Sequence, residues 1–106
     1  MKSPAIFDRI LAAVNSGNTA MFLDLFAEDG EVDDWGLIYR GWAEIQKWSD
    51  RELIGARARL TLRRVDLRHG EMCMIVRIGD AGFRGLSRFA FTLENGRIRR
   101  MEIPCM

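Results

Sequence analysis

Residues 33–48 read DDWGLIYRGWAEIQKW, and this stretch is the most informative part of the chain. Asp33 and Asp34 are adjacent carboxylates in a short segment with the character of a strand. All three tryptophans and the only tyrosine lie within 14 residues of Asp34. Aromatic side chains gathered beside an acid are typical of a small ligand pocket with one well-placed polar group. The stretch therefore predicts a pocket, but it does not name the ligand.

Helices are predicted before this stretch and in its second half. Apolar side chains recur at helical spacing in residues 4–14, and a second helix is expected over residues 18–29. Gly41 opens a third helix that continues to about Leu53. Between the second and third helices, residues 31–35 and 38–40 are predicted to be short extended segments.

Strands are predicted in the second half of the chain, over residues 57–68, 71–79, 83–93 and 97–103. Asn95-Gly96 is the strongest hairpin signal, because both residues tolerate positive φ. Turn residues also stand at 69–70 and 80–82. This order predicts an α+β fold with the helices on one face of a curved antiparallel sheet. No linker or repeat interrupts the pattern, so we expect residues 1–106 to form a single domain.

Charge and hydropathy narrow the classes of function. The net charge of +1 hides five basic against ten acidic residues in positions 1–55, and eleven arginines against five acidic residues in positions 56–106. The arginines alternate with apolar residues, as in Arg97-Ile98-Arg99, which is typical of a strand with one wet face rather than of a nucleic-acid surface. Apolar runs are short and no signal peptide is recognisable. We therefore expect a cytoplasmic protein that binds neither nucleic acid nor membrane.

Neither a metal nor another cofactor is predicted. The chain has one histidine, and the acids of residues 28–34 lack the spacing of a calcium loop. Cys73 and Cys105 do not form a Cys-x-x-Cys pair. Two reduced thiols are the simpler interpretation for a cytoplasmic protein, while a disulfide between them stays open.

Three segments carry a resemblance to a known group: LFAEDGEVDD (residues 25–34), YRGWAEI (residues 39–45), and FAF (residues 89–91) leading to GRI (residues 96–98). Nearly the whole chain resembles the nuclear transport factor 2-like superfamily, and it looks most like the SnoaL-like branch, which contains polyketide cyclases and is related to ketosteroid isomerases. The resemblance implies a cone-like α+β barrel, in which a curved antiparallel sheet wraps three N-terminal helices. This fold hosts enzymes, binders and interaction modules alike.

The resemblance implies a role for Asp34. In ketosteroid isomerases the general base is the aspartate of a Val-Glu-Asp pattern at the end of the first strand. Val32-Asp33-Asp34 is similar to this pattern and places Asp34 at the position of the base. Alternation along a strand places Val32 and Asp34 on one face and Asp33 on the other. The two donors that stabilise the enolate in those enzymes are not matched, because their positions fall on Ile10 and Ser87. Steroid isomerisation of the familiar kind is therefore not expected.

The expected site combines one acid with aromatic walls. Asp34 is the candidate catalytic residue. We expect it to line one cavity with Trp48, Ser87 and Phe89, with Tyr39 and Trp42 near the rim. An inward Arg88 would make the site an anchor for an acidic or carbonyl ligand. The predicted ligand-binding residues are Trp35, Tyr39, Trp42, Trp48, Ser87, Arg88, Phe89 and Phe91.

Three functions stay open at this point. A pocket for a small, mainly apolar ligand is favoured, because the second polar group of the related enzymes is missing. The alternatives are an isomerase, cyclase or dehydratase that uses Asp34 as general acid or base, and a non-catalytic dimerisation module with a filled cone. Asp34 has a structural alternative too, as a turn cap or a partner of Arg88. The structural alternative for the tryptophans is that they are core residues.

A homodimer is predicted from the strand over residues 71–79. Met72 and Met74 lie on one face of this strand, and Cys73 and Ile75 lie on the other. Because both faces are largely apolar, we expect both to be covered. A second chain on the sheet face away from the helices would provide that cover, as in relatives of this fold. C-terminal residues folding over the same face are the alternative.

Overall fold

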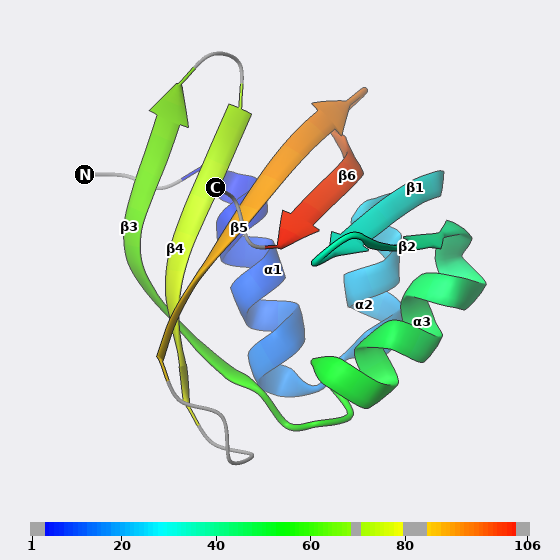
Figure 1. The fold of residues 1–106 in the computed structure, drawn as a ribbon, viewed down its shortest axis with the longest axis horizontal. Coiled ribbons are helices and arrows are strands. Elements are labelled where there is room, and N and C mark those ends of the chain that lie inside the picture. Colours follow the sequence, from blue (N-terminus) through cyan, green and yellow to red (C-terminus); the bar gives the residue numbers. More distant parts are fainter. Residues whose placement is uncertain (1–3, 69–70, 80–84, 104–106) are drawn as a thin grey trace.

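A curved sheet packs against helices in the computed structural model, which describes residues 4–68, 71–79 and 85–103 (Figure 1). The helices in these ranges are α1 (Ala5–Ser16), α2 (Thr19–Asp24) and α3 (Gly41–Glu52). The strands are β1 (Phe26–Asp34), β2 (Leu37–Arg40), β3 (Arg59–Arg68), β4 (Glu71–Gly79), β5 (Gly85–Glu94) and β6 (Arg97–Ile103). Figure 1 shows α1 in the hollow of the sheet. The predicted curved α+β fold is confirmed.

The strands form one mixed sheet in the order β2-β1-β6-β5-β4-β3. β1 pairs with β6 in parallel, whereas every other neighbouring pair in this order is antiparallel. The predicted sheet is therefore corrected in two respects: one of its pairs is parallel, and its described strands leave it open rather than closed into a barrel. A parallel pair needs a long crossover connection. The segment from β2 to β5, which includes α3, provides that crossover.

The second helix is shorter than the sequence pattern predicts. Asn18 caps α2, since its side chain accepts a hydrogen bond from the Met21 backbone N–H at 3.0 Å, but the helix ends at Asp24. Phe26 to Gly30 belong to β1 instead. The Ile98 backbone N–H donates to the Leu25 carbonyl at 2.8 Å, and a Cβ on Gly30 would lie 2.8 Å from the Ile98 carbonyl oxygen. Pairing with β6 therefore overrides the local helical pattern.

The core lies between the helices and the inner face of the sheet. α1 contributes a stripe of buried residues at helical spacing, including Phe7 and Ile10, which are fully buried. Trp48 of α3 is also buried. Strand and helix residues close this core from the other sides, and all are buried except Leu62, which is partly buried; they are Val32, Ile45, Leu60, Leu62, Phe89 and Phe91.

The turn between β5 and β6 confirms the hairpin signal. Asn95 and Gly96 have φ of 53° and 79°, as a two-residue type I′ hairpin turn requires. The turns predicted at 69–70 and 80–82, and Cys105, lie outside the described residues. Among the described helices, none is long and apolar enough to cross a membrane. The cytoplasmic location stays a prediction.

Asn15, near the end of α1, completes the backbone hydrogen bonding of β3. Its side-chain Nδ2 donates to the Leu60 carbonyl at 2.9 Å, and its Oδ1 accepts from the Leu60 N–H at 2.8 Å. β3 lies at an edge of the sheet, so this amide takes the place of a neighbouring strand. The contact fixes α1 against the edge strand.

We predict that Asn15→Ala lowers the free energy of unfolding by about 1–3 kcal/mol, because it leaves both backbone groups of the buried Leu60 without their partner. Urea denaturation measures the change. Ser16→Ala, at the exposed neighbouring position, serves as the control and should stay within about 0.5 kcal/mol of the parent chain. An equal effect of the two substitutions would contradict the role of Asn15.

Candidate functional site

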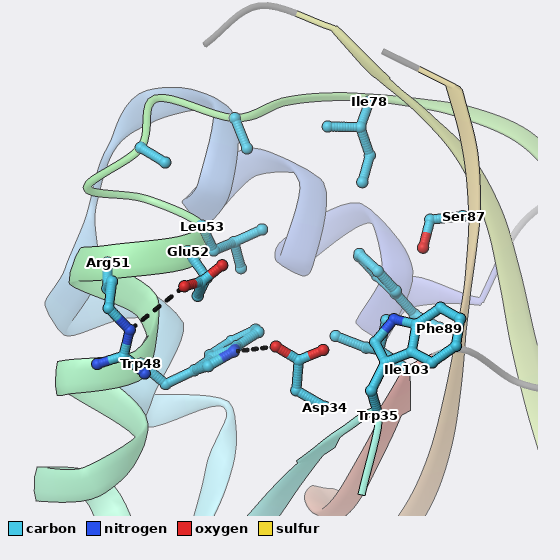
Figure 2. Close-up of a pocket in the computed structure, with 12 residues that line it drawn as sticks. Asp34, Trp35, Trp48, Arg51, Glu52, Leu53, Ile78, Ser87, Phe89 and Ile103 are labelled. Atoms are coloured by element: carbon cyan, nitrogen blue, oxygen red, sulfur yellow. Dashed lines mark hydrogen bonds and ion pairs between the residues drawn. The ribbon is translucent and has the colours of Figure 1, made fainter. Parts of the chain in front are cut away.

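A pocket of about 450 Å³ opens between α3 and the inner face of the sheet (Figure 2). Polar groups reach it from the end of β1, from α3 and from β5, while most of the remaining lining is apolar. Figure 2 shows these side chains converging on one space. The lining residues are Asp34, Trp35, Trp48, Arg51, Glu52, Leu53, Ala56, Ala58, Ile78, Ser87, Phe89 and Ile103.

Asp34 lines the pocket from the end of β1. Val32, two residues earlier on β1, is fully buried, so alternation along the strand turns Asp34 to the same inner face. Trp48 Nε1 donates a hydrogen bond to Asp34 Oδ2 at 2.9 Å. In Figure 2 the other carboxylate oxygen points away from Trp48, toward Phe89 and Ile103. Within the described part of the chain, Trp48 is the only hydrogen-bond partner of this side chain.

Trp48 is 2% exposed and anchors the site to the core. Its indole contacts the Asp34 carboxylate, and the hydrogen bond to Asp34 uses the single N–H group of the indole. The Tyr39 ring lies next to it, with 6.3 Å between the ring centroids. A buried indole therefore holds the carboxylate in one orientation.

A polar rim on α3 was not predicted from the sequence. Arg51 and Glu52 follow Trp48 by three and four residues, which places them on the same side of the helix. Arg51 Nε lies 3.3 Å from Glu52 Oε2, and Arg51 Nη2 donates to the Tyr39 hydroxyl at 2.9 Å. Both side chains are about half exposed. Helical spacing from Trp48 was the signal that could have identified them.

The structure brings together five of the predicted ligand-contacting and catalytic residues at this pocket, and all five lie on its lining: Asp34, Trp35, Trp48, Ser87 and Phe89. Tyr39 and Trp42 are outside the lining, although both pack against the core. The Tyr39 hydroxyl turns to Arg51, and Trp42 Nε1 donates to the Phe26 carbonyl at 3.1 Å. Trp42 thus binds the backbone of β1 rather than facing the pocket.

Arg88 and Phe91 are the other two exceptions. Arg88 follows Ser87 on β5 and therefore faces the outer side of the sheet, where Nη2 lies 3.5 Å from Asp66 Oδ2. It does not pair with Asp34, so the anchor for an acidic ligand is not formed. Phe91 is on the inner face but packs against Phe7, with 5.5 Å between the ring centroids. It belongs to the core beyond the pocket.

Asp33 supports the site from the opposite face of β1. The sequence predicts that it points away from Asp34, and it does, toward the outer face. Arg100 Nη2 lies 2.7 Å from Asp33 Oδ2, and the Gly36 N–H donates to Asp33 Oδ1 at 2.8 Å. Its side chain is only 14% exposed. Asp33 therefore stabilises the β1–β2 turn from the outer face of the sheet.

No protein-family model matches the sequence, and no curated protein matches it. Solved structures match over nearly the whole chain. A candidate polyketide cyclase from Sinorhizobium meliloti aligns with a TM-score of 0.81 and 22% identity, over 95% of this chain and 94% of the other. The Delta 5-3-ketosteroid isomerase of a Mycobacterium species aligns with a TM-score of 0.77 and 22% identity, over 96% and 91%.

A third protein has a ketosteroid isomerase-like fold and comes from Catenulispora acidiphila; its structure is a complex with trimethylamine. It aligns with a TM-score of 0.80 and 18% identity, over 98% of this chain and 87% of the other. At these identities the similarity establishes the fold. The chain has the curved α+β fold of nuclear transport factor 2-like and ketosteroid isomerase-like proteins.

We predict that the Trp48–Asp34 contact appears as a coupling free energy of about 1–2 kcal/mol in a double-mutant cycle of Trp48→Phe and Asp34→Ala. Phenylalanine keeps most of the buried ring and removes only the donor. Urea unfolding of the four proteins gives the coupling. A second cycle with Tyr39→Phe is the control: because the Tyr39 hydroxyl bonds to Arg51, its effect should add to that of Asp34→Ala within about 0.5 kcal/mol. Additive effects in both cycles would contradict the contact.

Proposed function

We propose that the protein binds a small, mainly apolar molecule in this pocket and that Asp34 is the polar anchor. The observation that carries the proposal is the Asp34 carboxylate: Oδ2 is held by Trp48, while the other oxygen points toward Phe89 and Ile103 (Figure 2). A carboxylate that borders an apolar cavity gains from a donor that a ligand supplies. A ligand with an apolar body and one hydroxyl or amine group fits these requirements.

The size and lining of the pocket support this proposal. A volume of about 450 Å³ lies in the range of small-molecule sites, and those sites are mostly apolar with a few well-placed polar groups. The open cavity also argues against the alternative of a filled, inactive cone. One protein of the same fold has been solved in complex with trimethylamine, a small molecule with apolar methyl groups and a polar nitrogen.

We predict that 2-naphthol binds more tightly than naphthalene, because only its hydroxyl can donate to Asp34. Asp34→Asn should remove most of the difference, a loss of roughly tenfold in 2-naphthol affinity, while naphthalene binding stays within about twofold. Asparagine has nearly the same shape as aspartate, so the fold should be preserved. Calorimetric titration measures each dissociation constant.

The matched control is Asp50→Asn, which changes an exposed acid on α3 outside the pocket. It should leave both dissociation constants unchanged. If neither probe binds the parent chain, the proposed pocket function is wrong. If Asp34→Asn binds 2-naphthol as the parent chain does, the role of Asp34 is wrong.

An enzyme that uses Asp34 as general acid or base is the second candidate. It is favoured by the position of Asp34 at the end of β1, inside the pocket of a fold shared with a ketosteroid isomerase. Among the described residues, Ser87 is the only one on the lining with a hydroxyl group. Ile10, at the position of the other donor in ketosteroid isomerases, is an apolar residue buried in the core. Proton abstraction would therefore depend on Ser87 or a Trp35 N–H to stabilise an enolate. Turnover of a β,γ-unsaturated ketone that disappears in Asp34→Asn would establish this function.

We also propose a homodimer through the outer face of the sheet, the face away from the helices. Cys73 and Ile75 lie on this face and are largely buried by their neighbours, while Leu86 is 67% exposed beside them. Charged pairs surround this apolar strip, among them Arg88 with Asp66 and Arg100 with Glu31. An apolar strip with a charged border is typical of a protein interface.

For this dimer we predict that Leu86→Glu shifts the protein to a monomer, because it places a charge on the apolar strip. Sedimentation equilibrium measures the mass. Leu67→Glu is the matched control, since Leu67 is 60% exposed but pairs with Met72 on the inner side of the sheet. It should leave the dimer intact. A parent chain that sediments as a monomer at tens of micromolar would refute the proposal.

A further inference from the structure

Trp35 occupies a backbone conformation that a tryptophan disfavours. Its φ is 54°, and Gly36 follows with φ of 89°. For a bulky residue with a Cβ, this left-handed region is a genuine outlier, and it costs free energy relative to glycine or asparagine. The same chain makes an equivalent turn with Asn95-Gly96, where φ is 53° and 79°. One hairpin therefore uses the residue that the turn favours, and the other uses tryptophan.

Three contacts hold the strained turn in place. The Trp35 backbone N–H donates to the Ile103 carbonyl at 2.7 Å, and the Gly36 N–H donates to Asp33 Oδ1 at 2.8 Å. Arg100 Nη2 in turn lies 2.7 Å from Asp33 Oδ2. Strained residues persist where the surrounding structure fixes them in this way, and they cluster at functional sites.

The indole contributes little to the fold. It is 75% exposed, the highest value among the large exposed hydrophobic side chains of the described residues. A side chain this exposed gains little from burial, so packing does not compensate for the backbone strain. Figure 2 shows the indole beside Asp34, on the side of the pocket formed by Phe89 and Ile103. Its position is at the mouth of the pocket.

We propose that Trp35 is a ligand-contacting residue that is retained at the expense of stability: its indole stacks on a flat apolar ligand whose donor group meets Asp34. This inference rests on the proposed pocket function and adds the class of ligand, a planar ring that carries a hydroxyl or amine. Trp35 and Asp34 are neighbours in the chain, so the turn sets the distance between the stacking surface and the polar anchor. Aromatic stacking gains from that geometry beyond the area it buries.

The experiment compares Trp35→Asn with the parent chain in two measurements, urea unfolding and calorimetric titration with 2-naphthol. Asparagine accepts the left-handed conformation, so the folding equilibrium constant should rise roughly fivefold. The loss of the stacking surface should weaken 2-naphthol binding roughly fivefold. The two measurements therefore move in opposite directions, which a purely structural tryptophan would not produce.

Asn95→Trp is the matched control. It introduces the same strain in the equivalent turn, away from the pocket, so it should lower the folding equilibrium constant and leave 2-naphthol affinity within about twofold. Trp35→Phe keeps an aromatic ring and should retain most of the affinity.

Two results for Trp35→Asn would overturn the inference while the pocket function stands: unchanged affinity for 2-naphthol, or a loss of stability. In the first case Trp35 does not contact the ligand, and in the second it is part of the fold. If the parent chain binds neither 2-naphthol nor naphthalene, the proposed pocket function and this inference are both wrong.

Discussion

The parallel pairing of β1 with β6 is the constraint on which the site depends. It aligns Val32 with Met101 and Asp34 with Ile103. The Trp35 backbone N–H then donates a hydrogen bond to the Ile103 carbonyl. β1 thereby becomes an interior strand, with β2 on its other side and α3 packed across it. Because the last residue of β1 is fixed on both sides, the carboxylate of Asp34 reaches the pocket at one depth and in one direction.

Two adjacent acids serve opposite faces of this strand end. Asp34 turns inward to the buried Trp48, and Asp33 turns outward to Arg100 and to the turn that carries Trp35. The outer contacts fix the backbone, and the inner contact fixes the carboxylate. A substitution of Asp33 would therefore reach the pocket through the turn, although its side chain is on the other side of the sheet. Asp33 therefore holds the backbone of the turn, and the adjacent Asp34 supplies the polar group of the pocket.

Local patterns in the sequence predicted the features that depend on local chemistry. Alternation placed Asp34 inward and Asp33 outward, the Asn95-Gly96 signal identified its hairpin, and the third helix was predicted to start at Gly41. The pairing of strands that are distant in the sequence could not be predicted from local patterns. The apolar residues around Phe26 suit a helix as well as a strand, and only the partner strand β6 decides between them. Arg88 faces outward by the same alternation that turns Ser87 inward, so the sequence could have excluded it from the pocket. Phe91 packs against Phe7, which is distant in sequence, so the sequence alone could not assign Phe91 to the core rather than to the pocket.

The corner formed by Asp34 and Trp35 departs from what stability alone would favour. A carboxylate faces a mostly apolar cavity with one hydrogen bond from the described residues, and the next residue is a tryptophan in a left-handed turn with its ring exposed. The backbone conformation of Trp35 is unfavourable for a residue with a bulky side chain. Elsewhere in the described chain the Asn18 cap accepts its hydrogen bond, and no side-chain polar atom that is fully buried lacks a partner. Arg57, with φ of 57°, is the other bulky residue in the left-handed region within the described ranges, and it lies outside the pocket lining. Both features border one pocket and come from adjacent residues, and this is why the proposed ligand combines a donor group for Asp34 with a flat ring for Trp35.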